Sequence, residues 1–119
     1  MKENFHETLR ALMDEYVHLV YDCTLKFPRD EVYGVTSQLR RSALSVVLNY
    51  IEGFGRQQKN TYRHFLEISY GSLKESLYLI DFSHKRGYLD AEQHQKLTAL
   101  GERIGGMLWS ITSKIKSVA

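Results

Sequence analysis

The residues best suited to chemistry in this chain are cations placed around a short glycine-containing segment. The segment GFGRQQKNTYR, residues 53–63, contains Arg56, Lys59 and Arg63. Successive backbone N–H groups in such a loop can cradle a phosphate, and cations add a sequence-independent attraction to a nucleic-acid backbone. Phe54 and Tyr62 supply rings on which unpaired bases can stack. Taken alone, these residues favour an ordinary exposed loop with solvated cations, and a nucleic-acid site is the alternative.

A second pair of cations lies earlier in the chain. Arg40 and Arg41 occur near the start of a helix predicted from about residue 36 to residue 53. We include both among the predicted phosphate contacts. The predicted nucleic-acid-binding residues are therefore Arg40, Arg41, Phe54, Arg56, Lys59 and Arg63, with Phe54 as the stacking group.

A line of polar residues follows one side of the same predicted helix. With a rotation of about 100° per residue, the polar residues between positions 38 and 52 fall within a narrow arc of the helix, and most of its remaining surface is apolar. Buried polar groups are unfavourable unless they are hydrogen-bonded, so this arc needs partners on a facing helix or a water-lined cavity. We interpret it as a structural hydrogen-bonding seam, with a ligand-binding seam as the alternative. The polar seam consists of Gln38, Ser42, Ser45, Asn49 and Glu52, with Glu75 from the next helix also assigned a structural role.

Metal binding has little support in the sequence. A di-iron helical bundle needs a Glu-x-x-His pair on each of two helices and a Glu on each of the other two. Glu15 and His18 have this spacing but fall off the apolar stripe of their helix, and Asp81 and His84 lie near a helix end. The sequence therefore predicts no metal site and no cofactor.

Catalysis has even less support. Cys23 lies on an apolar stripe, where a free cysteine is usually a small core residue. The chain contains no phosphate-loop lysine motif, no dinucleotide-binding fingerprint and no grouping of serine, histidine and aspartate that indicates a nucleophile. We expect a protein that is not an enzyme.

The elements that would position these residues are four amphipathic helices. Apolar residues recur every three or four positions over residues 3–26, 37–53, 61–85 and 91–115, and the sequence has a single proline. Thr36 or Ser37, then Asn60 or Thr61, are the expected caps of the second and third helices, and Asp90 with Gln93 forms a capping box. Gly53 is expected just after the second helix. Short connectors between four such helices predict an all-α, antiparallel up-down four-helix bundle.

Small residues on two helices suggest additional contacts. Ser69, Ser72 and Ser76 form a small-residue side of the third predicted helix, beside its apolar stripe. Gly101, Gly105 and Gly106 lie inside the fourth predicted helix, where each costs roughly 1 kcal/mol relative to alanine. The second predicted helix is apolar around most of its circumference and should be largely buried. These features are consistent with contacts between subunits, or with tight packing inside one bundle.

Composition limits the class of protein. The chain has 119 residues, 43% hydrophobic and 25% charged, which is typical of a single globular domain spanning 1–119. No apolar run could span a membrane, the first residues are too polar for a signal peptide, and a lone cysteine makes no internal disulfide, so we expect a cytoplasmic protein. The net charge is +2, and residues 29–63 carry six Lys and Arg against three Asp and Glu. The basic excess thus coincides with the predicted nucleic-acid site.

Three stretches of the chain resemble a known family. These are FPRDEVYGVTSQLRRSALSVVLNYIEGFGR, then YRHFLEISYGSLKES, then RGYLD. They resemble the 23S rRNA intervening-sequence proteins, also called four-helix bundle proteins, and the densest resemblance spans residues 27–75. Two departures are Tyr50 and Ile51, where the family usually has Ile-Ala, and the absence of an early tryptophan.

The resemblance implies a bacterial all-helical bundle that assembles into a ring-like homopentamer, with no catalytic activity and a role that is unsettled for most members. A related branch serves diversity-generating retroelements by binding nucleic acid and a reverse transcriptase. The implied partners are therefore RNA or DNA, other copies of the chain, and a reverse transcriptase or ribosomal component, without a membrane. We expect a nucleic-acid-binding bundle; a protein-binding scaffold with no nucleic-acid role is the alternative.

Overall fold

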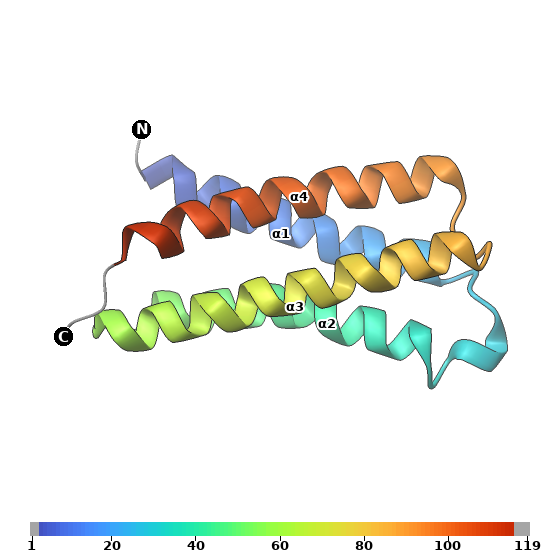
Figure 1. The fold of residues 1–119 in the computed structure, drawn as a ribbon, viewed down its shortest axis with the longest axis horizontal. Helices are drawn as coiled ribbons and strands as arrows, with labels where there is room; N and C mark the ends of the chain where they lie inside the picture. The colour runs from blue at the N-terminus through green and yellow to red at the C-terminus, as the bar shows by residue number, and fades with distance from the viewer. Residues whose placement is uncertain (1–2, 116–119) are drawn as a thin grey trace.

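The computed structural model describes residues 3–115, which contain four long helices and no strand (Figure 1). The helices are α1 (Glu3–Thr24), α2 (Val35–Phe54), α3 (Lys59–Lys85) and α4 (Ala91–Lys114), with a 3-10 helix, η1 (Arg29–Glu31), after the first. Successive long helices run in opposite directions (Figure 1). The prediction of an all-α chain with four helices is confirmed.

Each long helix packs against two others. α1 contacts α2 and α4, and α3 contacts the same two helices, so α1 and α2 form one layer and α3 and α4 form the other (Figure 1). The most extensive contact joins α2 and α3. At this contact the small, buried Ser69 side chain donates to the Val46 carbonyl at 2.6 Å, which requires a close approach of the two backbones.

The core contains the apolar stripes that the sequence predicts. On α1, Leu9, Leu12, Tyr16 and Cys23 are buried, while Glu15 and His18 are exposed. The other helices contribute completely buried side chains, namely Leu39, Val46, Leu66, Leu73, Ile80, Leu97, Ile104 and Leu108. One polar pair crosses this core: the Tyr16 hydroxyl of α1 lies 2.7 Å from Ser76 Oγ of α3.

The turns at one end of the bundle are fixed by side chains and by one glycine. The predicted capping box at the start of α4 is confirmed, since the Asp90 carboxylate accepts from the Gln93 N–H at 2.8 Å and the Gln93 amide oxygen accepts from the Asp90 N–H at 3.0 Å. Gly87 has φ of +82°, a backbone conformation that favours glycine. These two features set the turn between α3 and α4.

The predicted caps of α2 and α3 are wrong. α2 begins at Val35 after Gly34, and the Glu31 carboxylate accepts from the Val35 N–H at 3.2 Å, so neither Thr36 nor Ser37 caps it. α3 begins at Lys59 after Gln58, with no side-chain cap, so Asn60 and Thr61 lie inside the helix. A carboxylate from the preceding turn thus replaces the expected hydroxyl cap of α2.

Gly53 lies inside α2, which continues to Phe54, and not after its end as predicted. A Cβ atom at Gly53 would lie 2.7 Å from Phe65 Cβ and 3.3 Å from the Tyr62 carbonyl oxygen. The glycine is therefore explained by the close approach of α3, and not by a turn.

The expectation that α2 is buried around most of its circumference is also wrong for the single chain. Leu48 is 59% exposed and Ile51 is 43% exposed. Leu44, one helical turn before Leu48, is half-buried. One face of α2 therefore presents apolar side chains to the exterior.

Candidate nucleic-acid interface

The α2–α3 connector brings a glycine and a cation into a tight turn at one end of the bundle. The Gly55 N–H bonds to the Ile51 carbonyl at 3.4 Å, and the Arg56 N–H bonds to the Gly53 carbonyl at 2.9 Å. These bonds satisfy carbonyl groups at the end of α2 that no helical N–H can reach. The turn therefore holds Phe54 and Arg56 in fixed positions relative to the end of the bundle.

Aromatic side chains from three helices meet beside this connector. The Phe54 ring centroid lies 4.6 Å from that of His6, 5.8 Å from that of Tyr50 and 6.4 Å from that of Tyr62. Tyr50 is buried, whereas Phe54 is 55% exposed. We call His6, Tyr50, Phe54 and Tyr62 the aromatic cluster. This packing leaves one side of the Phe54 ring exposed to solvent.

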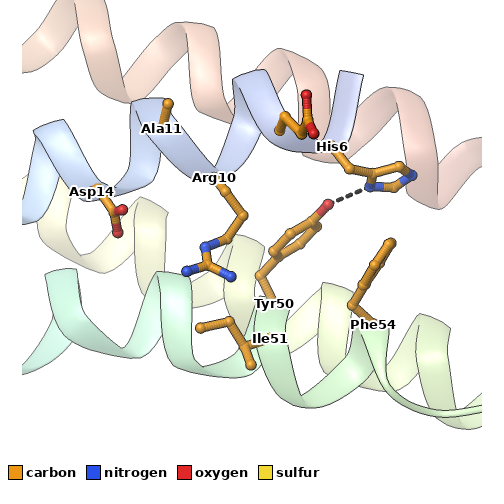
Figure 2. A pocket seen from close by; sticks show the side chains of 8 residues that line it. His6, Arg10, Ala11, Asp14, Tyr50, Ile51 and Phe54 are labelled. Carbon is orange, nitrogen blue, oxygen red and sulfur yellow. Dashed lines mark hydrogen bonds between the residues drawn. The ribbon is translucent and has the colours of Figure 1, made fainter. Parts of the chain in front are cut away.

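A hydrogen bond between His6 Nδ1 and the Tyr50 hydroxyl connects α1 to α2 within the cluster (Figure 2). Burial lowers the pKa of His6 and raises the pKa of Tyr50. At neutral pH the imidazole is therefore neutral and the phenol is protonated, so these two groups add no charge to the site.

A cavity of about 460 Å³ opens beside the cluster, between α1 and α2 (Figure 2). Its walls include His6, Tyr50 and Phe54, and its charged groups are Glu7, Arg10 and Asp14. A second hollow on the other side of His6 is lined by residues of α4, including Lys114. The cluster thus stands between two hollows, each with a cation at its edge.

The cations predicted around the connector differ in how they are engaged. Arg56 pairs with the Glu52 carboxylate one turn earlier on the surface, and its guanidinium carbon lies 5.4 Å from the Phe65 ring centroid. Exposed pairs of this kind are worth only about 0–1 kcal/mol, so a phosphate can compete for Arg56. Lys59 is exposed at the first position of α3.

Arg63 has a structural connection as well as a surface position. Its Nε donates to the Glu67 carboxylate at 3.1 Å, and its guanidinium donates to the Ile115 carbonyl oxygen at 2.9 Å. Arg63 therefore ties α3 to the residue that follows α4.

The structure places Arg40 and Arg41 away from the connector cations. Arg40 lies fourteen positions before Phe54 on α2, a distance of about 21 Å along the axis at ~1.5 Å per residue. The Arg40 Nε donates to Thr24 Oγ1 at 2.7 Å, and its guanidinium carbon lies 4.6 Å from the Tyr21 ring centroid. Arg40 joins α2 to the end of α1, while Arg41 is exposed. The six predicted residues therefore form two groups at different ends of the bundle.

The polar seam divides into an inner and an outer part. Ser45 Oγ lies 2.7 Å from Ser72 Oγ of α3, and the Asn49 amide donates to Ser45 Oγ and to the Ser45 carbonyl, both at 2.9 Å. Gln38, Glu52 and Glu75 are exposed in the single chain, so the hydrogen bonds between α2 and α3 involve only the inner part of the seam.

Two serines of α3 outside the predicted seam also form hydrogen bonds with α2. Ser69 Oγ donates to the Val46 carbonyl at 2.6 Å, and Ser72 pairs with Ser45. Both belong to the small-residue side predicted on the third helix, where serines spaced three or four apart mark one helix face.

The described residues contain no group of three or more His, Cys, Asp or Glu side chains arranged to hold a metal ion. Cys23 is buried, and burial raises the pKa of its thiol, which disfavours the thiolate. Across residues 3–115, none of the helices combines the length and apolar character needed to cross a bilayer.

Comparisons with known proteins give the family. No curated protein matches the chain. Among solved structures, the fold is similar to a protein of unknown function from the S23 ribosomal protein family of Bacteroides thetaiotaomicron, with a TM-score of 0.79 and 19% identity over 87% of this chain and 97% of that one. At this identity the likeness concerns the fold. The sequence profile of the 23S rRNA-intervening sequence proteins matches residues 10–110, and the chain belongs to that family.

Proposed function

We propose that this protein is a non-enzymatic, cytoplasmic RNA-binding bundle that contacts RNA through the α2–α3 connector and the aromatic cluster. The observation that carries the proposal is the half-exposed Phe54 ring, which packs among other rings and precedes Arg56 by two positions and Lys59 by five. An aromatic platform beside cations is the combination that single-stranded nucleic acid binds, because bases stack while phosphates are neutralised. RNA is the first nucleic acid to test, because the family is named after an intervening sequence of 23S rRNA.

The proposed roles follow from how each side chain is engaged. Lys59 and Arg56 contact phosphate, since one is exposed and the other has only a surface partner that a phosphate can replace. Phe54 stacks on an unpaired base. Peripheral phosphate contacts come from Arg63 and, at the far end of α2, from Arg40 and Arg41. Arg63 and Arg40 also connect helices of the bundle through their hydrogen bonds.

We further propose that copies of the chain assemble into a ring-like homopentamer, as the resemblance to the family implies. Five chains of net charge +2 would give a particle of net charge +10. Such a field attracts RNA more strongly than a single chain does and repeats the connector around the ring. A reverse transcriptase or a ribosomal component would then meet the RNA on this particle.

The proposal is tested with nuclease-treated protein titrated into labelled single-stranded RNA over a range of salt concentrations. The variant Arg56→Gln/Lys59→Gln should bind more weakly, and its log–log salt slope should fall by about 1.4, because each phosphate contact to a single strand contributes about 0.7. Phe54→Leu keeps an apolar side chain but removes the ring, and should lose about 1–3 kcal/mol of binding per stacked base.

The matched control is Lys26→Gln/Lys85→Gln, which removes the same charge at the opposite end of the bundle, where both lysines are exposed. This variant should retain the wild-type slope. An equal loss in both variants would show general charge attraction and would exclude the connector as the site. Absence of RNA binding by the wild type at low salt would favour the protein-binding scaffold, which the exposed Trp109 and Tyr78 side chains also suit.

A further inference from the structure

The cavity of about 460 Å³ between α1 and α2 contains charged groups that the proposed RNA site does not use. We call this cavity the α1–α2 hollow, and its size lies within the range of about 300–1,000 Å³ that is typical of small-molecule sites. Its α1 wall has Glu7, Arg10 and Asp14, spaced three and four positions apart and therefore on one face of the helix. Its α2 wall has the partly exposed Ile51 and Phe54 side chains. The hollow thus has charges of both signs on one side and an apolar, partly aromatic wall on the other.

Arg10 extends across this hollow and does not pair along its own helix. Glu7 precedes Arg10 by three positions and Asp14 follows it by four, which are spacings at which opposite charges on a helix can pair. Within residues 3–115, however, Arg10 forms no ion pair with either carboxylate. Its side chain extends from α1 toward α2 (Figure 2). Burial raises the pKa of Tyr50 and the positive charge of Arg10 opposes that rise, which places the guanidinium near the phenol. The donors of Arg10 are therefore directed into the hollow, where a ligand can reach them.

The charges of the hollow disfavour a phosphate. One arginine and two carboxylates give the hollow a net charge of −1, whereas the connector presents the cations Arg56 and Lys59. Because like charges repel, a phosphate is attracted to the connector and not to the hollow. The group that suits the hollow is therefore uncharged, with hydrogen-bond donors for a carboxylate and acceptors for an arginine.

Phe54 connects the hollow to the proposed RNA site. The ring lines the α1–α2 hollow but not the hollow on the other side of His6. A base that stacks on Phe54 from this side has its edge toward α1. Glu7 directly follows His6, whose ring contacts Phe54, and Arg10 lies one helical turn further along α1. Asp14 lies another turn away, so Glu7 and Arg10 are the charged groups nearest to that base.

Guanine is the base whose polar groups match this pair of side chains. Its O6 and N7 atoms both accept hydrogen bonds, and an arginine can donate to both at once. Its N1–H and N2 amine both donate, and a carboxylate, which only accepts, can receive both. Adenine has a donor, its N6 amine, beside N7 and so presents an N–H group to the arginine. Uracil and cytosine have no N7, so neither presents the pair of acceptors that an arginine binds.

We propose that the α1–α2 hollow binds an unpaired guanine, which stacks on Phe54, accepts from Arg10 through O6 and N7, and donates to Glu7 from N1 and the N2 amine. The inference rests on the proposed stacking of an RNA base on Phe54 and names that base. It gives a role to an arginine that pairs with neither neighbouring carboxylate. The guanine can belong to an RNA strand or to a free nucleoside, and the experiments below separate these two sources.

The first test changes the base. An end-labelled oligouridylate with one central guanosine is compared, by fluorescence anisotropy at one salt concentration, with strands that carry adenosine, inosine or 7-deazaguanosine at that position. Guanosine should bind about 5–150-fold more tightly than adenosine, the discrimination typical of a bidentate contact. Inosine, which lacks the N2 amine, and 7-deazaguanosine, which lacks N7, should each bind more weakly than guanosine. Equal affinity for the guanosine and adenosine strands would overturn the inference and leave the connector site intact.

The second test assigns each contact to a side chain. Glu7→Ala should abolish the preference for guanosine over inosine and keep the preference over 7-deazaguanosine, whereas Arg10→Met should do the reverse. The readout is the ratio of affinities, because removing a carboxylate also weakens its repulsion of every phosphate. Glu15→Ala removes the same charge from α1 outside the hollow and should keep both ratios. All three side chains are exposed, so the variants should keep the wild-type circular dichroism. Ratios that stay unchanged in both Glu7→Ala and Arg10→Met would overturn the inference.

A third measurement separates failure of the hollow from failure of the RNA site. Guanosine and adenosine are each titrated into the wild-type protein, and the ring signals of Phe54 and His6 are followed by NMR. Shifts that only guanosine produces, in a protein that binds no RNA, would reject the proposed function and retain the hollow as a nucleoside site. A protein that binds no RNA and shows no guanosine-specific shift would overturn both. Arg56→Gln/Lys59→Gln should weaken RNA binding and leave the response to free guanosine unchanged, since neither side chain lines the hollow.

Discussion

The hydrogen bond that crosses the core between Tyr16 and Ser76 gives a prediction with a definite sign. The Tyr16 hydroxyl lies 2.7 Å from Ser76 Oγ, and Ser76 Oγ donates to the Leu73 carbonyl at 2.8 Å. Since a serine hydroxyl has one hydrogen, Tyr16 must be the donor in the bond to Ser76. Both side chains are fully buried, and burial raises the pKa of Tyr16, so the phenol keeps its proton.

The two single substitutions should therefore differ. Ser76→Ala leaves the buried Tyr16 hydroxyl without its acceptor, which should lower the free energy of unfolding by about 1–3 kcal/mol. Tyr16→Phe leaves Ser76 bonded to the Leu73 carbonyl and removes only the net value of one hydrogen bond, about 0.5–1.5 kcal/mol. The assay is urea unfolding followed by circular dichroism, at a fixed protein concentration because assembly would shift the midpoint.

The double variant Tyr16→Phe/Ser76→Ala completes the test. Because no unpaired hydroxyl remains, its loss should be smaller than the sum of the two single losses, with a coupling of about 0.5–3 kcal/mol. The higher helix propensity of alanine affects both backgrounds equally and cancels in the cycle. Additive losses, or a larger loss for Tyr16→Phe, would refute the assignment of donor and acceptor.

Three further predictions concern positions where the structure corrected or extended the sequence analysis. Gly53→Ala should destabilise the bundle by about 1–3 kcal/mol through overpacking against Phe65, as measured by urea unfolding; an unchanged midpoint would contradict the close approach of α3. Hydrogen bonds from the Val35 N–H and the Tyr88 hydroxyl lower the pKa of Glu31 below its ordinary value of 4.5, so its stabilising contribution is present above pH 4.5 and lost as the pH falls through the lowered value. Tyr88→Phe should reduce this acid-dependent loss in unfolding measured against pH, and an identical pH profile would exclude the contact. Arg40→Lys should lower the free energy of unfolding by about 0.5–1.5 kcal/mol, because it removes the Nε bond to Thr24. Thermal unfolding measures this loss, and an unchanged midpoint temperature would contradict the prediction.

The regular parts of the fold were predictable because their signals are local. The apolar stripe through Leu9, Leu12 and Tyr16 needs only the helical period, and the capping box of Asp90 and Gln93 lies within four residues. The start of α2 was not predictable in this way. Glu31 takes the role expected of Thr36 or Ser37 because η1 folds its carboxylate back onto the Val35 N–H.

The candidate site shows the same limit. Phe54, Arg56 and Lys59 are close in sequence, so their grouping could be predicted. His6 contacts Phe54 only because α1 packs on α2, and no spacing in the sequence predicts that contact. Arginine side chains are usually exposed, yet Arg40 is half-buried because it packs against Tyr21 and Thr24 at the end of α1.

The unequal contacts between the helices bear on the order in which the bundle forms. The extensive α2–α3 contact closes a loop of a few residues, whereas the α1–α4 contact joins the two ends of the chain. Closing a long loop loses more chain entropy, so we expect the α2–α3 hairpin to form first and α1 to dock on α4 late in folding. Pulse-labelled hydrogen exchange should show amides of α2 and α3 protected before those of α1, and the reverse order would contradict this. His6 would then reach Phe54 only in the last stage, so the aromatic cluster would be absent from partly folded chains.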